Sequence, residues 1–262
     1  MSLEQHIIDD IATHLHGAYK EHREVTKVTD DCPQLDVVAA YQIQDQIRAR
    51  MLEQGDRLIG MKMGLTSRPK MQQMGVNAPI YGFLMDAFAV EDGGQVDTST
   101  LIHPKVEAEI AFVMKHDLLG PGCDEAAVVA ATDFVLPAIE VIDSRYKDFR
   151  FDLPSVIADN TSASYFVTGS KATSIEGLDL STLGVVMEVN GEVVAVGAGA
   201  EVLGNPATAV AMLVNMLSEK GESLPAGSVV LSGAITAAFA VKRGDSVLVR
   251  TAEAGSVSLT FK

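Results

Sequence analysis

The sequence predicts an α+β protein in which a small N-terminal helical portion, residues 1–56, lies on a β-rich body, residues 57–262. Two observations support this class. Up to Gly55, apolar residues recur at steps of three or four, which is the period of a helix. From Leu58 onwards, short apolar runs are separated by Gly, Pro and Asp, which is typical of strands and turns. A run of helices followed by a run of strands favours an α+β arrangement.

Two helices are expected in the N-terminal portion. The stretch 7–15 has apolar residues four apart, and the stretch 40–51 has them three or four apart. Asp36 is placed to cap the second helix, and Gly55 is placed to end it. The polar stretch 26–33 between the two is expected to be a loop.

Three further helices are expected in the body. Ser67 followed by Pro69 is typical of a helix N-terminus, because the serine caps the helix and proline suits its first turn. Asp124 is placed to cap a helix that runs through Ala131. A third helix is expected over 206–220, between residues that favour a helix start and a glycine that favours its end.

The other apolar runs predict the strands of the body. Asn190-Gly191 between two such runs is the strongest hairpin signal, because both turn positions need positive φ. The expected strands cover residues 106–113, 134–142, 184–190, 192–196, 228–231, 246–251 and 256–261.

Charge and composition exclude several classes of function. Thirty-five acidic and 20 basic residues give a formal net charge of −15, which disfavours binding to nucleic acid or to anionic membranes. A small anionic substrate is not excluded, because it responds to the local field of a pocket. The uncharged run 223–241 is broken by Pro and Gly, so we expect strand, turn and strand there, with no membrane span.

The cysteines and the N-terminus indicate the compartment. Cys32 and Cys123 fit neither a disulfide framework nor a zinc motif. The N-terminal stretch lacks the positively charged and apolar regions of a signal peptide. We therefore expect a cytoplasmic protein with reduced thiols.

The stretch 105–112 carries the most informative pattern. Its apolar residues alternate with Lys105, Glu107 and Glu109, so a strand would place both carboxylates on one face. Residues two apart on a strand are separated by about 6.5–7 Å, and Glu is long enough for both carboxylates to converge on one point. A solvated outer face with a Lys–Glu pair is the alternative.

A third carboxylate, Glu140, lies in the almost wholly apolar run 134–142. A buried carboxylate needs a cation partner or a raised pKa. Three carboxylates on neighbouring strands, without His or Cys, would favour a hard cation such as Mg²⁺ or Mn²⁺. An ion pair of Glu140 with Arg145 or Lys62 is the alternative.

Lys62 is the charged residue within the otherwise apolar run 58–64. A lysine there could bind an anionic substrate or move a proton, because burial lowers its pKa. The alternative is a lysine whose head reaches the surface. The polar stretches 143–145 and 159–162 are either site residues or plain turns. A dinucleotide fingerprint, a Walker A lysine and a serine nucleophile elbow are all missing from the sequence.

Several strings resemble the fumarylacetoacetate hydrolase superfamily over nearly the whole chain. They are similar to its branch of hydratases and decarboxylases, which act in the meta-cleavage degradation of aromatic compounds. The resemblance implies a mostly β core with a rolled mixed sheet or pseudo-barrel. It also implies that Glu107, Glu109 and Glu140 hold Mg²⁺ or Mn²⁺. The strings are LIGMKMGLTSRPKMQQMGV, PIYGFL, LIHPKVEAEIAF, LPAIEVIDSRY, ADNTSAS and LSGAITAA.

One position favours decarboxylation within that branch. The hydratases commonly have an aspartate after the proline of PIYGFL, whereas this chain has Ile80, which cannot move a proton. The resemblance therefore implies a lyase that decarboxylates 4-oxalocrotonate (2-oxohex-3-enedioate) to 2-hydroxypenta-2,4-dienoate. Lys62 would be catalytic, Arg145 and Ser162 would contact the substrate, and Leu65 and Ile80 would form an apolar wall near the departing carboxylate.

Two other functions stay open at this stage. One is hydration of 2-hydroxypenta-2,4-dienoate (2-oxopent-4-enoate) at the same metal site, and the other is a non-catalytic partner subunit. The resemblance also implies a homo-oligomer and a complex with the hydratase of the pathway. The stretch 70–78, with its Gly75, could close over the site as a lid.

Overall fold

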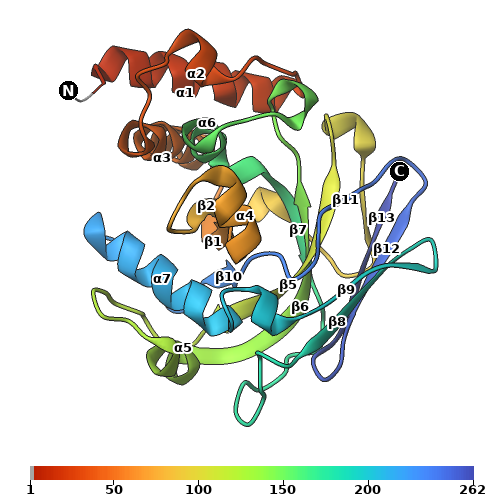
Figure 1. Cartoon of the computed structure of the whole chain (residues 1–262). Coiled ribbons are helices and arrows are strands. Elements are labelled where there is room, and N and C mark those ends of the chain that lie inside the picture. The colour runs from red at the N-terminus through yellow and green to blue at the C-terminus, as the bar shows by residue number, and fades with distance from the viewer. Residues whose placement is uncertain (1–2) are drawn as a thin grey trace.

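The computed structural model describes residues 3–262 and begins with three helices that cover one end of the sheets (Figure 1). They are α1 (Gln5–Glu21), α2 (Val28–Asp31) and α3 (Val37–Glu53). Asp36 caps α3 as predicted, because its side chain accepts a hydrogen bond of 2.8 Å from the backbone N–H of Ala39. The expected loop 26–33 contains α2, a single turn that is too short to leave a periodic signal.

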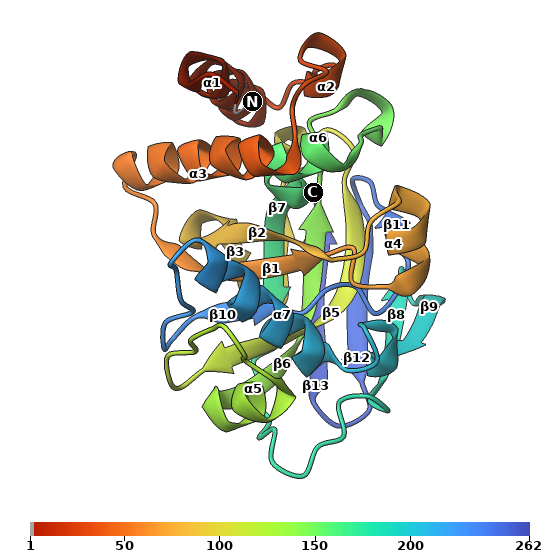
Figure 2. The same cartoon turned by 60° about the vertical axis from the view of Figure 1, so that its left-hand side comes forward.

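Two sheets form the body of the molecule. The larger has the strand order β2-β1-β10-β5-β6-β7-β3, with β11 also paired to β5, and the smaller has the order β4-β13-β12-β8-β9. Three pairs are parallel (β1–β10, β3–β7 and β4–β13) and the others are antiparallel, so both sheets are mixed. Figures 1 and 2 show the sheets curling into a half-barrel, with β12 and β13 packed against β6.

The strands largely match the apolar runs of the sequence, and the predicted fold class is confirmed. Asn190 and Gly191 turn the β8–β9 hairpin with φ of 56° and 82°, as predicted. The strands are β1 (Leu58–Gly64), β2 (Ile80–Met85), β3 (Ala89–Val90), β4 (Gly94–Val96), β5 (Lys105–Met114), β6 (Thr132–Ile142), β7 (Ala163–Thr168), β8 (Gly184–Val189), β9 (Glu192–Ala198), β10 (Val229–Leu231), β11 (Phe239–Ala240), β12 (Ser246–Thr251) and β13 (Gly255–Phe261).

Four helices belong to the body. Three were predicted: Ser67 and Asp124 cap two of them as expected, and Asn205 caps the third. The four are α4 (Arg68–Met74), α5 (Glu125–Ala131), α6 (Leu153–Ala158) and α7 (Pro206–Glu219). Single 3₁₀ turns lie at Asp86–Phe88, Thr98–Thr100, Lys147–Phe149, Asn160–Ser162 and Gly199–Glu201.

One helical stretch of the described chain, Gly199–Glu219, has the length and hydropathy of a membrane span by composition alone. The cap at Asn205 separates its first turn from α7, which has 14 residues. A helix of that length is about 21 Å long, short of a bilayer core of about 30 Å. Because α7 packs against α5 and β1, it is a core helix of this fold.

The hydrophobic core runs without a break from the N-terminal helices into the sheets. Ile8 and Ile43 of the helices belong to the same buried cluster as Phe83 of β2 and Ile139 of β6. A buried glutamine, Gln44, also joins the two parts through its side-chain amide. The helical portion is therefore joined to β2, which pairs with β1 at one end of the larger sheet (Figure 2).

Candidate metal centre and substrate cavity

Glu107, Glu109 and Glu140 lie together in the pair of β5 and β6. The antiparallel register sets Glu107 directly opposite Glu140, and Glu109 follows two residues later on the same face of β5. The exposed fractions of the three residues are 8%, 0% and 1%. One carboxylate oxygen from each lies within 4.8 Å of those of the other two. The alternative of a solvated outer face is therefore wrong.

Two oxygens of this carboxylate trio lack partners that would compensate their burial. Oε2 of Glu109 accepts a hydrogen bond of 2.7 Å from the backbone N–H of Gly233. Within residues 3–262, Oε1 of Glu109 and Oε2 of Glu140 accept no hydrogen bond. Buried polar atoms rarely lack a hydrogen-bond partner. A donor set made only of oxygens suits a hard divalent cation. The residues present therefore fit Mg²⁺ or Mn²⁺.

The electrostatics of the trio favour a bound cation. Burial raises the pKa of Glu109 well above its ordinary value, and the charges of Glu140 and Glu107 raise it further. Burial also raises the pKa of Glu140, although Lys62 opposes this shift. Three carboxylates this close repel one another when ionised, and a cation between them would relieve that repulsion.

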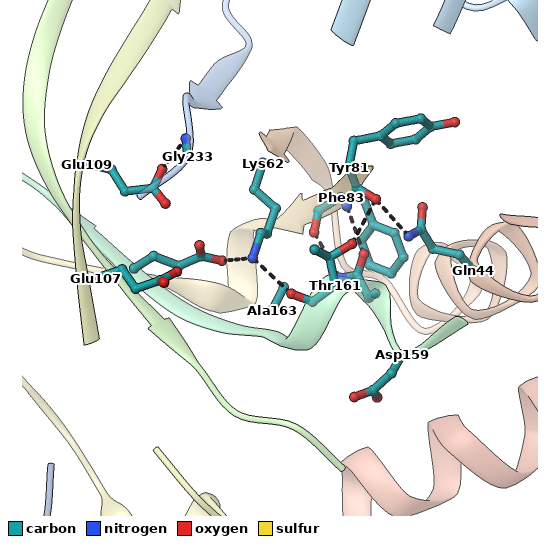
Figure 3. Close-up of polar contacts among 12 residues, drawn as sticks. Gln44, Lys62, Tyr81, Phe83, Glu107, Glu109, Asp159, Thr161, Ala163 and Gly233 are labelled. Atoms are coloured by element: carbon teal, nitrogen blue, oxygen red, sulfur yellow. Dashed lines mark hydrogen bonds and ion pairs between the residues drawn. The ribbon is translucent and has the colours of Figure 1, made fainter. Parts of the chain in front are cut away.

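Lys62 projects from β1 toward the carboxylate trio and is 2% exposed. Its Nζ forms an ion pair with Oε1 of Glu140 and donates a hydrogen bond of 2.9 Å to the backbone carbonyl of Thr161 (Figure 3). The alternative of a lysine that reaches the surface is therefore wrong. Of the two cation partners considered for Glu140, the structure places Lys62 beside it.

A cavity of about 510 Å³ lies next to these groups. Its wall includes Lys62 and Glu107 together with three other predicted site residues, Leu65, Ile80 and Ser162. The hydroxyl of Ser162 is buried and makes no hydrogen bond within the described chain. The cavity therefore joins charged groups, an apolar wall and an unpaired hydroxyl, which is a usual composition for a small-molecule site.

Arg145 is the one predicted site residue that lies away from both the trio and the cavity wall. Its Nε donates to Oδ1 of Asp159 at 2.5 Å, and one terminal nitrogen donates to the carbonyl of Ala163 at 3.0 Å. The other terminal nitrogen donates to the carbonyl of Asp159 at 2.6 Å. The guanidinium is thus engaged in holding the chain that follows α6.

The prediction missed three cationic residues of the cavity wall, Lys70, Lys105 and Arg150. Nζ of Lys105 lies 3.9 Å from the ring centroid of Phe149. Lys105 lies two residues before Glu107, so a strand places both side chains on the same face. The sequence therefore contained a signal for Lys105 in the site. Arg150 lies in a connecting loop, and no periodic pattern could have identified it.

Lys70 of α4 donates a hydrogen bond of 2.9 Å to Oε1 of Glu107. A cation that binds the trio competes with this lysine for the same carboxylate. Replacing Lys70 with Met should therefore lower the Kd for Mg²⁺ by up to about fivefold, since partly exposed ion pairs contribute about 0–1 kcal/mol. Isothermal titration calorimetry measures this change, and an unchanged or higher Kd would contradict it.

Comparisons with known proteins agree with this geometry. Residues 62–262 match the family model described as fumarylacetoacetate (FAA) hydrolase, C-terminal. The chain is 55% identical over 251 residues to a 4-oxalocrotonate decarboxylase of Pseudomonas putida, covering 96% of this chain and 95% of that protein. It is 38% identical over 254 residues to a 2-keto-4-pentenoate hydratase of Paraburkholderia xenovorans strain LB400, covering 97% and 94%.

A solved structure is also similar over the full length. It is a 4-oxalocrotonate decarboxylase from Pseudomonas putida G7 complexed with magnesium and adipate, with a TM-score of 0.97 and 52% identity. The alignment covers 100% of this chain and 99% of that one. On the matched family model and on these full-length relatives, the chain belongs to the fumarylacetoacetate hydrolase family.

Proposed function

We propose that this chain decarboxylates 4-oxalocrotonate to 2-hydroxypenta-2,4-dienoate with a divalent cation, Mg²⁺ or Mn²⁺, as cofactor. The observation that carries the proposal is the buried carboxylate trio beside a cavity in which Ile80 is apolar. Relatives at 55% and 41% identity named 4-oxalocrotonate decarboxylase support it. The adipate in the similar structure is a six-carbon dicarboxylate, like the proposed substrate.

The reaction consumes one proton and releases one CO₂. The bond to the terminal carboxylate of the substrate breaks, and its electron pair moves through the C3=C4 bond onto the 2-oxo oxygen to give a dienolate. Proton uptake then gives the dienol. When bound, the divalent cation supplies Lewis-acid stabilisation of negative charge on the substrate oxygens.

We assign the remaining work to residues of the cavity. Lys62 lies beside the trio, where its ammonium group can stabilise the dienolate charge or return a proton. The unpaired hydroxyl of Ser162 is free to bind a substrate oxygen. Leu65 and Ile80 would surround the departing carboxylate, whose poor solvation there favours its conversion to neutral CO₂. Arg145 does not line the cavity, and its role would be to hold the chain on either side of Ser162 through Asp159 and the carbonyl of Ala163.

The substrate is a dianion, although the protein has a net charge of −15. Lys105 and Arg150 line the cavity and form no ion pair within residues 3–262, so their charge is available to a ligand. Their presence, together with the bound cation, offsets the surrounding negative charge. We therefore assign them to the attraction of the dicarboxylate.

A paired assay tests the proposed function. Incubation with 4-oxalocrotonate and Mg²⁺ should release CO₂ and form the dienol, and EDTA should stop both. Ile80→Asp should lower decarboxylation at least about tenfold, because a carboxylate at the apolar wall repels the departing one. Ile80→Leu is the matched control and should retain activity. Rapid hydration of the dienol by the native protein, without decarboxylation, would instead identify a hydratase.

Hydration remains the second candidate because relatives at 36–39% identity bear hydratase names. Both reactions would use the same carboxylate trio. A non-catalytic partner subunit is the least favoured function, because Lys62 and all three glutamates are present and brought together.

We also propose that the chain forms a homo-oligomer. β9 is the outer strand of the smaller sheet, and it exposes Val193 and Val196 by 59% and 68%. An exposed apolar edge strand favours association with another chain. Light scattering after size-exclusion chromatography decides between monomer and oligomer, and Val196→Lys should weaken an association through this edge.

Three further proposals follow from the same assignment. A complex with a hydratase is supported by the proposed product. One relative is named 2-hydroxypent-2,4-dienoate hydratase, so its name contains the compound that this chain would release. A cytoplasmic location is supported by two free cysteines, Cys32 and Cys123. A division into a helical portion, 1–56, and a catalytic body, 57–262, is supported by the family match over 62–262.

A further inference from the structure

Three consecutive residues beside Lys62 adopt a backbone conformation that their side chains disfavour. Asn160, Thr161 and Ser162 have φ of 48°, 53° and 58°, and all three are buried. Left-handed backbone costs an ordinary residue about 1–2 kcal/mol, although Asn tolerates it better than most. Such a run persists only where the surrounding structure fixes it, and strain of this kind clusters at functional sites.

The side chains of Asn160 and Thr161 fix the segment to β2. Oδ1 of Asn160 accepts a hydrogen bond of 2.8 Å from the backbone N–H of Phe83, and its Nδ2 donates one of 3.0 Å to the carbonyl of Phe83. The hydroxyl of Thr161 donates one of 2.9 Å to the carbonyl of Tyr81. Figure 3 shows Thr161 beside Tyr81 and Phe83 of β2. In this way the amide of Asn160 satisfies both backbone polar groups of one strand residue.

Two glycines allow this close approach. A Cβ on Gly82 of β2 would lie 2.8 Å from the carbonyl oxygen of Asn160, and one on Gly64 of β1 would lie 2.6 Å from a methyl carbon of Thr161. No ordinary side chain fits at that separation. The segment therefore lies close against the backbones of both β1 and β2.

The N-terminal helices support the same strand. Gln44 of α3 donates hydrogen bonds of 3.0 Å to the carbonyl of Tyr81 in β2 and to the carbonyl of Ile157 in α6, three residues before the segment. The carbonyl of Tyr81 thus receives both Gln44 and the hydroxyl of Thr161. The helical portion is in this way connected by hydrogen bonds to the residues next to the cavity.

The result of this fixation is the placement of two polar groups. The carbonyl of Thr161 accepts the hydrogen bond from Nζ of Lys62, and the hydroxyl of Ser162 lies unpaired in the cavity wall. Lys62 has only one other polar contact within the described chain, Glu140. The direction of its ammonium group therefore depends on where the carbonyl of Thr161 points.

We infer that Asn160 is a positioning residue for catalysis, which acts through the left-handed segment 160–162 on Lys62 and Ser162. This inference rests on the proposed roles of Lys62 and Ser162. Asn160 contacts neither the cavity nor the carboxylate trio, so its contribution is to fix the backbone. The reacting groups of an enzyme must be held closely, and a displacement of about 1 Å can lower turnover by about 100-fold.

The test is Asn160→Asp, which keeps the shape and the acceptor and whose ionised form cannot donate to the carbonyl of Phe83. We expect kcat for decarboxylation to fall by about 10- to 100-fold, with KM changed less than about threefold. Mg²⁺ affinity from calorimetry should stay within about threefold of the native value, because the trio is untouched. A loss confined to thermal stability, with native kcat in the folded protein, would overturn the inference.

Asn190→Asp is the matched control. Asn190 also has positive φ, and its side chain also donates to one neighbour and accepts from a backbone N–H, but it lies in the β8–β9 turn. Its replacement should lower the melting temperature and leave kcat unchanged. If both variants lower kcat equally, the effect is general destabilisation and the inference fails.

A second pair of variants decides the matter if Asn160→Asp does not fold. Thr161→Val removes the hydrogen bond to Tyr81 with little change of shape, whereas Thr161→Ser keeps it. We expect Thr161→Val to lower kcat, whereas Thr161→Ser should keep kcat within about threefold of the native value. Equal kcat in both would overturn the inference. A native protein without decarboxylase activity would instead count against the proposed function.

Discussion

Replacing Lys62 with Met is expected to lower kcat for decarboxylation by orders of magnitude and, at the same time, to strengthen Mg²⁺ binding. Lys62 is the buried cation beside Glu140, and it repels any second cation at the carboxylate trio. Its removal takes away that repulsion and also the group assigned to the dienolate. We expect kcat to fall by about 10²- to 10⁴-fold, which is the usual contribution of a side chain that transfers a proton.

The same replacement should destabilise the protein when no metal is bound. Glu140 would be left as a buried carboxylate without its cation, and breaking one side of a buried ion pair costs about 3–5 kcal/mol. Thermal melts with EDTA and with Mg²⁺ measure the effect, and the increase in Tm on adding Mg²⁺ should be larger in Lys62→Met than in the native protein. Calorimetry measures the Kd for Mg²⁺ directly.

Lys70→Met is the matched control for this prediction. Lys70 also contacts the trio, but its side chain is 39% exposed and its partner Glu107 lies at the cavity. Its replacement should leave stability nearly unchanged, because a partly exposed ion pair contributes little. Native turnover by Lys62→Met would remove Lys62 from the chemistry. If Mg²⁺ raised the Tm of Lys62→Met less than that of the native protein, the result would contradict the account in which Lys62 repels the cation.

The carboxylate trio could be predicted because local patterns determine it. Alternation along 105–112 put Glu107 and Glu109 on one face, and the apolar run 134–142 marked Glu140 as a buried acid. The cross-strand register that sets Glu107 opposite Glu140 was not visible in either run. It depends on the pairing of two strands, which single-strand periodicity does not specify.

Other parts of the site depend on contacts between distant segments. Arg145 was expected at the substrate from the family resemblance, but its partner is Asp159, in the segment that follows α6. The left-handed backbone of Asn160 and Thr161 depends on hydrogen bonds to β2, about 80 residues away in sequence. The polar string alone was equally consistent with an ordinary turn.

The cavity wall shows the same limit. Ile80 and Leu65 were identified from the family resemblance, whereas Lys70 and Arg150 were missed. Both lie on short elements, α4 and the connection before α6, whose orientation is set by packing and not by periodicity. Sequence patterns therefore found the three carboxylates and Lys62 of the central strands, but they missed Lys105 of β5 and the cations that the connections bring to the cavity.

Without a divalent cation, the native protein should lose stability as the pH rises above the ordinary glutamate value of 4.5. Glu109 and Glu140 have raised pKa values in the folded state, chiefly because they are buried. In that pH range the folded protein holds protons that the unfolded chain has released. By linkage, stability then falls with increasing pH, by about 1.4 kcal/mol for each unit of pKa shift.

Mg²⁺ should reverse this dependence, because it binds the ionised carboxylates and displaces their protons. The increase in Tm on adding Mg²⁺ should therefore grow as the pH rises above 4.5, and melts at several pH values with Mg²⁺ or EDTA measure it.

Glu109→Gln separates this effect from other titrating groups. The lowered pKa of His16, which burial causes, makes stability rise with pH up to about 6.5, which opposes the trend. His16 is present in both proteins, so its contribution cancels when the pH profiles are subtracted. The variant should be more stable than the native apoprotein at pH 8, because a neutral amide replaces a buried charge, and it should respond weakly to Mg²⁺. Parallel pH profiles for the two apoproteins would show that Glu109 titrates normally, and the trio would then lack the electrostatic strain that favours its cation.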